Sequence, residues 1–581
     1  MTSVASPTGR SLSATTSSGA LTVQAFVGDG CTLLAFDVKA SATQDLAGFA
    51  IQRTDPGGNT EYLLNSLNFS TKLTQASDEK TVHSTATPSD KAPIQKFRWI
   101  DFPSDFNEGE CTYVIQTMYF SGNEASLKVG DTVKLSVTLG SREGTKFYVG
   151  FTRGYLSSQA YSRKFPDNLE FRPSDHEEYL FDTTTYEQKW AWLGYHARKM
   201  LFNFLDEAAA NQGVSGLDAF IYDVDEPDFV KSLISFGRNK KLRVILDDSK
   251  EKGKEKPDRQ HFAELIAPII GRDNVLRTHF HRFAHDKVLI TKDGDDKAIG
   301  VLCGSANFSI RGLYVQGNSV AVIDDPDVAA AYETAFSTAW NSESEFASEP
   351  VANQWYKFEN SSDLPEFAVS FAPHEDGELA LQAVERRISA ANNNVIFALM
   401  SPGGGNVIGD LEKLSKSPNI FTFGIVQGAN FAAQLIQGGG EVKDGKVQNE
   451  ISSFTALDKL VPEPFLKEFD GGKGQVIHHK FVVVDFNGAT PAVYFGSSNL
   501  TSGGERENGD NLLAVYDREI ATMFAIEGIR LADHYRFRDA LKSATSAKPL
   551  TLQGPGVKPA WYSDYYTPGT AKYRSRLTLI Q

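Results

Sequence analysis

Two patterns of apolar and polar residues divide the chain into an N-terminal and a C-terminal part. Over residues 21–155, β-branched and aromatic residues alternate with polar ones in short runs such as LTVQAFV, CTLLAFDVKA and KFYVGFT. Alternation with a period of two is typical of half-buried strands, and turn signals such as Asp55-Pro56-Gly57-Gly58 separate the runs. Several short strands punctuated in this way predict an all-β sandwich or barrel.

Within this region the successive runs GFAIQRTD, FRWIDFP and CTYVIQTMYF resemble a fibronectin type III-like sandwich in their order. The resemblance implies a module that binds or positions another molecule, and a packing partner for the rest of the chain is an equal alternative. Residues 1–20 contain many Ser and Thr, one Arg and no apolar stretch of the length that a signal peptide needs. We therefore expect a disordered leader ahead of the sandwich.

After about residue 165, helical and strand patterns alternate, which indicates an α/β fold. Buried-strand patterns at 217–224 and 242–248 enclose a predicted helix over 226–238. The same order recurs where the strand patterns VIFALMSP and IFTFGIVQ enclose the helical pattern VIGDLEKLSK. We therefore expect two α/β repeats, over residues 165–345 and 376–581, joined by a polar connection at 346–375.

Each repeat contains the same short motif in the same place. A His-x-Lys triplet runs into an apolar strand, and the next strand ends in Gly-Ser-x-Asn, whose Asn lies 22 residues after the first histidine and 21 after the second. Both copies close with Asn-x-x-Ala-Val-x-Asp, at 318–324 and 511–517. A single His-x-Lys is usually an exposed edge or a satisfied core histidine, but two in register indicate function. The motif residues are His285, Lys287, Ser305 and Asn307 in the first copy and His478, Lys480, Ser497 and Asn499 in the second.

This motif resembles that of the phospholipase D superfamily, HxKxxxxD followed by GSxN, and the second copy matches it completely, Asp485 included. The resemblance covers about residues 182–538. It implies an α/β phospholipase D-like fold in which two pseudo-twofold repeats of one chain meet at a single site, so that a monomer would suffice. It also implies cleavage of phosphodiester bonds through a covalent phosphohistidine, with no cofactor.

The residue types fit that chemistry. A neutral imidazole can attack phosphorus, and the opposite imidazolium can protonate the leaving oxygen and then act as a base. The lysines share a strand face with their histidines, and with the serines and asparagines of Gly-Ser-x-Asn they would surround the phosphate oxygens. The lysines supply the positive charge, so no metal is expected, and the nearby His279 and His281 lack supporting carboxylate or Cys ligands. His479 should point away from the site, because side chains alternate along a strand.

The first copy departs from the motif. Lys292 stands where the aspartate is expected, and Asp293 lies one residue late. When the two copies are aligned on their closing strings, Asp510 of the second copy matches Gly317 of the first, beside Gln316. The two halves of the site are therefore expected to be chemically unequal.

From this asymmetry we hypothesise that Asp510 reaches across the seam to support His285 as the nucleophile, because a carboxylate fixes an imidazole in one tautomer. His478 would then be the general acid, oriented by Gln316. The arrangement resembles that of tyrosyl-DNA phosphodiesterases, which pair one histidine with a carboxylate and the other with an amide. Because the first motif is eroded, a catalytically inactive binding scaffold is the alternative.

The motif does not choose between phospholipids and nucleic acids. The run from Lys231 to Gln260 holds ten basic residues against five acidic ones, and the segment from Trp561 to Tyr566 is rich in aromatics. Either segment could contact nucleic acid or, as a peripheral membrane contact, anionic lipid; either could also be an ordinary solvated or packed surface. The formal net charge of −15 disfavours polyanions, so a phospholipid substrate is favoured and a nuclease is the alternative.

The sequence also bears on the compartment. No run of about 18 apolar residues predicts a membrane span. The three cysteines, Cys31, Cys111 and Cys303, are too few for a disulfide framework. We expect free thiols and a cytoplasmic protein; a Cys31–Cys111 pair and export by a route without a recognisable signal are the alternatives.

Overall fold

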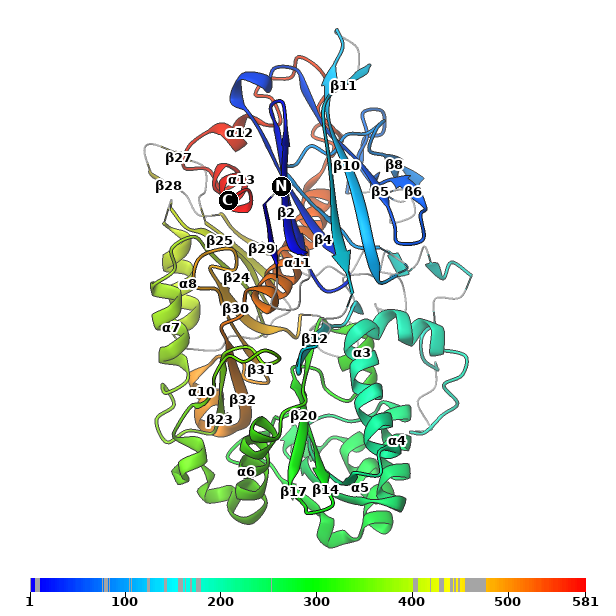
Figure 1. Ribbon diagram of the computed structural model, residues 1–581, viewed down its shortest axis with the longest axis vertical. Coiled ribbons are helices and arrows are strands. Elements are labelled where there is room, and N and C mark those ends of the chain that lie inside the picture. The colour runs from blue at the N-terminus through cyan, green and yellow to red at the C-terminus, as the bar shows by residue number, and fades with distance from the viewer. Residues whose placement is uncertain are drawn as a thin grey trace.

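An antiparallel β region and two α/β halves make up the fold (Figure 1). The β region is blue to cyan in that view, the first half is green, and the second runs from yellow to orange. The all-β region followed by α/β layers, which the sequence predicted, is confirmed. The computed structural model describes residues 2–5, 11–75, 77, 82, 84–103, 105, 107–122, 126–140, 144–154, 160–161, 164–167, 170–173, 179–251, 253–400, 406–417, 419–427, 433–438, 442–443, 446–447, 450–454 and 477–581.

The N-terminal region is built from two facing antiparallel sheets. The long strand β10 (Gly109–Phe120) alternates buried and less buried residues, as its sequence pattern requires, and places Tyr113 and Ile115 in the core between the sheets. The fibronectin type III-like classification stays a prediction. One sheet has the order β1 (Thr2–Ala5), β2 (Ser11–Ser18), β3 (Leu21–Val27), β4 (Thr32–Val38), β9 (Arg98–Asp101), and the other the order β11 (Leu127–Leu139), β10, β5 (Leu46–Thr54), β6 (Thr60–Tyr62).

Two boundaries of this region differ from those expected. Residues 11–18, placed in a disordered leader, form β2 and pair with β3 in antiparallel register from Ser13 to Ser18. Their Ser- and Thr-rich sequence hid the strand, because a strand near the edge of a sheet needs few apolar side chains. The run KFYVGFT, assigned to the sandwich, instead supplies β12 (Phe147–Phe151), which pairs with β21 of the first α/β half.

The first half is a mixed sheet covered by helices on both faces. Its strands are almost wholly buried, which explains their continuous apolar sequences. The strand order is β12, β21 (Ser319–Ile323), β20 (Ala298–Gly304), β19 (Val288–Asp293), β13 (Val214–Ile221), β14 (Lys241–Asp247), β17 (Val275–Thr278), and the helices are α3 (Glu187–Ala210), α4 (Pro227–Asn239), α5 (Pro257–Ile270) and α6 (Pro326–Ser342).

The second half repeats this order of elements. Its helix α11 (Arg518–Ser543) packs on the central strands of the sheet and also contacts β3 of the N-terminal region. The strand order is β22 (Tyr356–Phe358), β23 (Phe367–Ala372), β32 (Asn508–Val515), β31 (Ala492–Gly496), β30 (Lys480–Val484), β24 (Asn394–Met400), β25 (Phe421–Gln427), β26 (Ala433–Gln437), β29 (Glu450–Phe454), and the other helices are α7 (Leu381–Ser389), α8 (Asn406–Ser415) and α10 (Ser502–Glu507).

Each half begins earlier than the sequence indicated. β12 pairs antiparallel with β21, the last strand of the first half, and β23 pairs in the same way with β32, the last strand of the second. The connection expected at 346–375 therefore contains β22 and β23, the first two strands of the second half's sheet. β12 and β23 are short apolar runs, which were absorbed into the neighbouring segments because periodicity alone does not assign a run of five or six residues to a sheet.

The C-terminal segment returns to the N-terminal region. The indole of Trp561 donates a hydrogen bond to the Leu46 carbonyl at 2.8 Å, and the Tyr565 ring lies 4.6 Å from that of Phe97. These aromatics therefore complete the core of the sandwich. The helices here are α12 (Ser563–Tyr566) and α13 (Ala571–Leu579), and the short strands elsewhere are β7 (Leu64–Asn65), β8 (Thr87–Pro88), β15 (Lys250–Glu251), β16 (Lys254–Glu255), β18 (Phe283–Ala284), β27 (Val442–Lys443) and β28 (Lys446–Val447).

The three cysteines are free and buried, so the alternative Cys31–Cys111 disulfide is absent. Burial raises the pKa of the Cys111 thiol to about 11, which keeps it protonated. Among the described residues, no helix combines the length and the apolar character needed to cross a membrane.

Candidate active site

The two motif histidines lie at the seam between the halves, each held by a backbone contact across it. The His285 amide donates to the Gly509 carbonyl at 2.9 Å, next to the pairing of β18 with β32. The His478 amide donates to the Gly317 carbonyl at 3.1 Å, next to the bridge between Gly317 and Ile477. The same construction therefore occurs twice, related by the repeat.

His285 is paired with a carboxylate of the other half. Its Nδ1 lies 2.7 Å from Asp510 Oδ1, and both side chains are buried. The second carboxylate oxygen, Oδ2, accepts a hydrogen bond from the Asn508 amide at 3.2 Å. The contact that the sequence placed across the seam is thus present. A proton on Nδ1 serves this hydrogen bond and leaves the Nε2 lone pair of a neutral His285 free.

His478 is paired with an amide rather than a carboxylate. Its Nδ1 lies 2.8 Å from Asn318 Oδ1, which also accepts the hydroxyl of Ser305 at 2.8 Å. The amide nitrogen of Asn318 donates to the Gly312 carbonyl at 2.8 Å, which fixes the direction of the amide. Asn318 therefore presents an acceptor to His478, and this histidine also carries its proton on Nδ1.

The orienting amide is Asn318 and not Gln316, which corrects the sequence alignment by one residue. Strand pairing matches Gly304 with Val320 and Gly496 with Leu512, so Val320 and Leu512 are equivalent. The equivalent of Asp510 is then Asn318, two residues earlier in each case. The repeated closing string Asn-x-x-Ala-Val-x-Asp misled the alignment. Counting forward from Gly-Ser-x-Asn, 11 residues in both copies, gives the correct pair.

The two lysines extend from the same strand ends as their histidines. Lys480 Nζ lies 2.9 Å from the His478 carbonyl and 3.2 and 3.3 Å from the two nitrogens of the His478 ring. Lys287 Nζ donates to the His285 carbonyl and lies 4.6 Å from the centre of the Tyr222 ring. Both ammonium groups therefore point into the seam beside the imidazoles.

The asparagines of Gly-Ser-x-Asn have unused hydrogen-bonding capacity. The Oδ1 atoms of Asn307 and Asn499 are buried, and neither has a hydrogen-bond partner among the described residues. Buried polar atoms in proteins are normally satisfied, so an orphan in each copy of a repeated motif indicates a place where another molecule binds. An amide oxygen accepts hydrogen bonds, so contact with phosphate oxygens would have to come from the Nδ2 groups, and the phosphate-binding role of both asparagines stays a prediction.

The two serines of the motif are used inside the protein. The Ser305 hydroxyl donates to Asn318, and the Ser497 hydroxyl lies 3.1 Å from Asp286, with both serines fully buried. Ser497 also accepts the Asn511 amide at 2.9 Å. The expected phosphate contact of Ser305 and Ser497 is therefore corrected: they brace the residues that orient the histidines.

The motif aspartate lies outside the site. Asp485 follows β30 at the end opposite His478 and accepts the backbone amides of Asn392, Asn393 and Asn394 at 2.7–3.2 Å. It joins β30 to the start of β24 and so supports the sheet. Its counterpart Lys292 is buried at the equivalent strand end, 3.6 Å from Asp218. The residue that differs between the two motif copies therefore lies away from the seam.

Burial and the two lysines set the charge states of the histidines. The pKa of His285 is well below its ordinary value, because burial and then Lys287 and Lys480 disfavour the imidazolium. The pKa of His478 is lowered for the same reasons. Both lysines therefore lower the pKa of each histidine. Burial also raises the pKa of Asp510 to about 6, against the attraction of Lys287.

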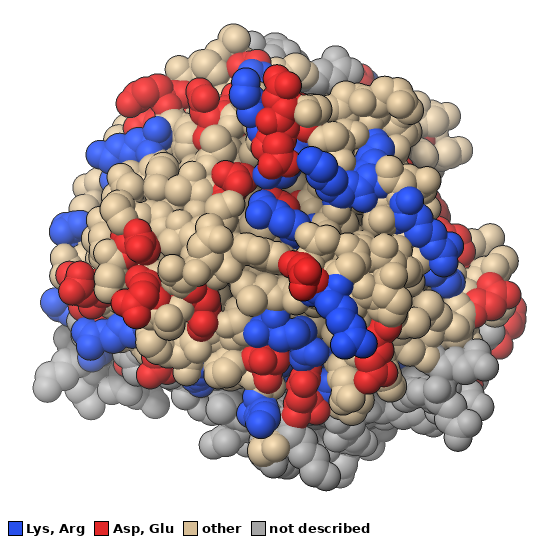
Figure 2. Space-filling model, turned by 90° about the horizontal axis from the view of Figure 1, so that it is seen from below, with Lys and Arg blue, Asp and Glu red and all other residues tan. Residues whose placement is uncertain are grey.

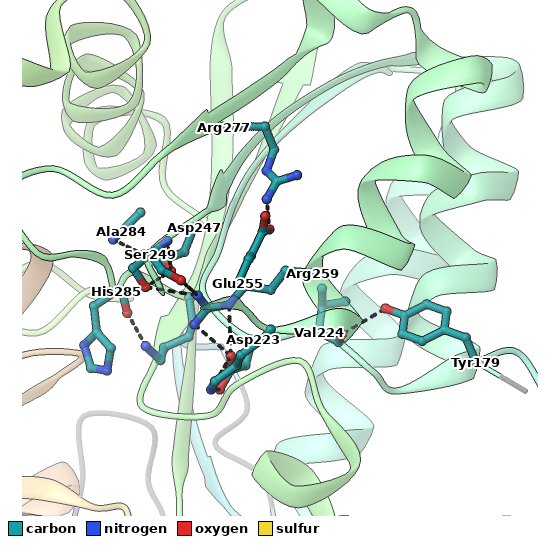
Figure 3. Close-up of polar contacts among 12 residues, drawn as sticks. Tyr179, Asp223, Val224, Asp247, Ser249, Glu255, Arg259, Arg277, Ala284 and His285 are labelled. Carbon is teal, nitrogen blue, oxygen red and sulfur yellow. Dashed lines mark hydrogen bonds and ion pairs between the residues drawn. The ribbon is translucent and has the colours of Figure 1, made fainter. Parts of the chain in front are cut away.

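A chain of buried and partly buried ion pairs lies behind His285 (Figure 3). Arg259 pairs with Asp223 at 3.0 Å and with Asp247, whose Oδ2 accepts the Ala284 amide at 2.6 Å. Lys256 binds Asp223 at 2.8 Å. Because Ala284 precedes His285, the chain fixes the backbone that enters the site. Sequence reasoning missed these residues, which come from different elements and share no motif.

The other histidines lie apart from the seam chemistry. His479 points into the core, with Nε2 3.2 Å from Glu527, as alternation along the strand predicted. His279 is half exposed and contacts Asp248 at 2.6 Å. Among the described residues, no three His, Cys, Asp or Glu side chains are grouped so that they could hold a metal ion. The sequence Ser401-Pro402-Gly403-Gly404-Gly405, which at a strand end suggests a loop near the mouth of the site, lies outside the described residues.

Comparison with known proteins gives one family model and several distant structures. The family model, described as cardiolipin synthase, PLD-like domain, matches residues 208–340 and 443–527. Polyphosphate kinase from Porphyromonas gingivalis is similar at 12% identity and a TM-score of 0.35, over 65% of this chain and 53% of that one, so the chain spans about half of it. No curated protein matches.

Two further solved structures are similar over parts of the chain. Phosphatidylserine synthase from Haemophilus influenzae has 10% identity and a TM-score of 0.39, over 58% of this chain and 84% of that one. Nuc, a phospholipase D family member from Salmonella typhimurium, has 21% identity and a TM-score of 0.20, over 24% and 86%. The two segments matched by the family model carry both copies of the motif, one with His285 and the other with His478. Each half of the chain therefore contains a segment that matches the family model of a phospholipase D-like domain.

Proposed function

We propose that the chain is a metal-independent phosphodiesterase that hydrolyses phospholipids through a covalent phosphohistidine at His285. The observation that carries the proposal is the pairing of two converging imidazoles with unlike partners, His285 with Asp510 and His478 with Asn318. A carboxylate stabilises positive charge on an imidazole, whereas an amide offers only an acceptor oxygen. The site therefore provides one histidine suited to become phosphorylated and one suited to exchange a proton.

In the first step, Nε2 of neutral His285 attacks phosphorus, and the bond from phosphorus to the leaving oxygen breaks. Protonated His478 gives its proton to that oxygen, so that an alcohol departs. The product is a phosphorylated His285 whose positive charge faces Asp510. In the second step, neutral His478 takes a proton from water while the water oxygen attacks phosphorus. The P–N bond breaks, which releases a phosphomonoester and restores both histidines.

Binding of the substrate phosphate favours the protonated form of His478, which can then act as the general acid. In the free site, burial, Lys480 and Lys287 keep the pKa of His478 well below its usual range. An anionic phosphate placed between the lysines offsets their charge and favours the imidazolium. Asn318 does not hold that proton as tightly as a carboxylate would, so His478 can release it to the leaving group.

The lysines and asparagines are suited to bind the non-bridging oxygens. Lys287 and Lys480 enter from opposite halves, and the side chains of Asn307 and Asn499 stand at matching positions of the two copies. Donors held in place before the reaction stabilise the charge of the transition state, and removal of one such donor typically lowers kcat by about 10²–10³. These groups supply positive charge and hydrogen bonds without a metal.

The distribution of basic residues favours a substrate with one phosphodiester over a long polyanion. Ion pairs already engage four of the ten basic residues in the run from Lys231 to Gln260, and Arg243, for example, binds Asp218 at 2.6 Å. On the face drawn in Figure 2, acidic and basic side chains are interspersed. Nucleic acid binding draws on rows of unpaired basic side chains along the backbone. The name of the matched family model, cardiolipin synthase, points in the same direction.

The aromatic segment from Trp561 to Tyr566 does not help to choose between a phospholipid and a nucleic acid substrate. Trp561, Tyr565 and Tyr566 pack against the N-terminal sandwich, and the Tyr566 hydroxyl donates to the Val38 carbonyl at 2.5 Å. These side chains are used in the core and do not form a stacking platform for bases or an interfacial belt. The preference for phospholipid rests on the charge distribution and the family model.

The test is incubation with mixed phospholipid vesicles and, separately, with supercoiled plasmid DNA, both in EDTA. We expect release of headgroup from the vesicles, formation of a new phosphodiester when a primary alcohol is added, and intact plasmid. His478→Asn should abolish the release, whereas His279→Asn, a control at an exposed histidine 51% accessible, should retain it. Nicking of the plasmid without lipid turnover would establish a nuclease, and no turnover of either would indicate a binding scaffold.

A further inference from the structure

The two lysines of the site stand in different surroundings, although they come from equivalent positions. Lys480 Nζ lies against the ring of its own histidine, 3.2 Å from His478 Nδ1. Lys287 Nζ instead lies 4.6 Å from the centre of the Tyr222 ring. The same tyrosine ring stands 4.7 Å from the His285 ring at an interplanar angle of 71°. One aromatic side chain thus contacts both the lysine and the histidine of the first motif.

The position equivalent to Tyr222 in the second half is not a tyrosine. Phe220 pairs with Val288 and Ala398 pairs with Phe481, and these partners each lie three residues after a motif histidine. Counting two residues onward along each strand matches Tyr222 with Met400. The methionine is buried and its amide donates to the His479 carbonyl at 3.1 Å. The aromatic contact is therefore a feature of the first half and not of the repeated fold.

We propose that Tyr222 is a positioning residue, which holds the Lys287 ammonium beside the phosphate site and sets the His285 ring for attack. An ammonium group over an aromatic face is attracted by the negative face of the ring, and the attraction is larger when the pair is shielded from water. An edge-to-face contact restricts how the imidazole can turn. This inference rests on the proposed function, because it assigns Lys287 and His285 to the nucleophilic side.

Tyr222 is itself fixed from behind. The guanidinium carbon of Arg259 lies 4.5 Å from its ring centre, and the Lys256 ammonium lies 5.4 Å away. Arg259 is almost fully buried between Asp223 and Asp247, which prevents it from moving away from the ring. The ion-pair chain behind His285 therefore supports Tyr222 as well as the backbone of Ala284.

Several charges besides the ring act on Lys287. Burial lowers its pKa to about 8, and the carboxylates oppose this effect. Removal of the aromatic face should lower the pKa further, since the ring favours the charged form. The charged or titratable groups around Lys287 include Asp510, Asp286, Asp223, Asp247, Lys480, Arg259, His285 and His478.

The decisive measurement follows Lys287 directly and needs no turnover. The full chain is labelled with ¹³C at lysine Cε, and the Lys287 resonance is assigned by its loss in Lys287→Arg. We expect Tyr222→Leu and Tyr222→Met to titrate at lower pH than the unmodified chain, whereas Tyr222→Phe, which keeps the ring, titrates with it. Met400→Leu, the matched change in the second half, should leave the titration unchanged.

Turnover of a soluble aryl phosphodiester supplies the second readout. We expect Tyr222→Leu to lower kcat by about 3- to 30-fold, the range that a cation–π contact of ordinary strength corresponds to, with Tyr222→Phe close to the unmodified chain. An unchanged Lys287 titration in a folded Tyr222→Leu variant would overturn the proposal, whatever the activity. Absence of turnover in the unmodified chain, with the titration shifted as expected, would instead count against the proposed function alone.

Discussion

Asn318 and Asp510 hold the same position in the two halves, and each is hydrogen-bonded to the histidine of the opposite half, 2.8 Å from His478 and 2.7 Å from His285. The repeated motif alone would make two equal imidazoles. An amide on one side and a carboxylate on the other make them unequal, because only the carboxylate can balance a positive charge on its partner. The asymmetry of the site is therefore concentrated in this pair.

Asp510→Asn should disable the enzyme without unfolding it. The Asn508 amide donates to Asp510 Oδ2, so the new NH₂ group would avoid that side and face Nδ1 of His285. His285 would then move its proton to Nε2 and lose the lone pair that attacks phosphorus. A wrong tautomer of this kind costs up to about 10⁴ in kcat in a serine protease, and we expect a loss of about 10²–10⁴ here.

The measurement for this substitution is steady-state turnover together with thermal unfolding. Asp485→Asn is the matched control, because Asp485 belongs to the same half but binds backbone amides at the far end of β30. It should lower the free energy of unfolding while changing kcat little. Full activity of a folded Asp510→Asn variant would show that the carboxylate does not orient the nucleophile.

Replacement of His478 should trap the covalent intermediate on His285. A substrate with an activated leaving group, such as an aryl phosphodiester, needs little help from a general acid in the first step. Hydrolysis of the phosphohistidine still needs a base, and His478→Asn removes it. Intact-mass and peptide measurements on the acid-labile adduct should place the phosphoryl group on His285 of that variant, and none should form with His285→Asn. An adduct on His478 of the His285→Asn variant would reverse the assignment.

Ser305→Ala should affect the reaction rather than substrate binding. The hydroxyl donates to Asn318 Oδ1 and is fully buried, so its loss frees the amide that orients His478. A neutral hydrogen bond of this type contributes about 1 kcal/mol, which corresponds to a fall in kcat of about fivefold. Steady-state kinetics should show kcat lowered and KM unchanged. A raised KM with an unchanged kcat would restore Ser305 as a phosphate ligand.

Much of the fold could be predicted because its core strands have clear apolar patterns in the sequence, and the same order of patterns occurs twice. The apolar runs that became β13, β14, β24 and β25 are long, buried on both faces and separated by helices, so their pattern identifies them. The strands that escaped prediction or were assigned to the wrong sheet have weak local signals. β2 is mostly Ser and Thr, and β12 and β23 are short apolar runs whose partners lie far along the chain.

The residues of the site likewise fall into those that the sequence predicted and those that it missed. His285, His478, Lys287 and Lys480 are marked by the duplicated motif, and Asp510 was found from the asymmetry between the copies. Asn318 was missed by one position, because a similar string occurs in both copies in shifted register, and a shift of one residue reverses the face on which a side chain lies. Tyr222 and Arg259 carry no motif. They become visible only when strand pairing brings the ends of β13 and β19 together.

The dependence of kcat/KM on pH should be bell-shaped, with its acid limb at about pH 6 and its alkaline limb at about pH 8. The acid limb belongs to Asp510, whose pKa burial raises to about 6: the carboxylate that accepts the His285 proton is present above that pH and is lost below it. The alkaline limb belongs to Lys287, whose pKa burial lowers to about 8: the ammonium is present below that pH and is lost above it. Lys287→Arg should shift the alkaline limb rather than remove it, because the guanidinium stays charged while Lys480, whose pKa burial and then Lys287 hold well below its ordinary value, still titrates. The profile is measured with a phosphodiester that does not itself titrate between pH 5 and 9, an interval of about one pH unit beyond either limb. A flat profile over this range would show that neither group controls the reaction.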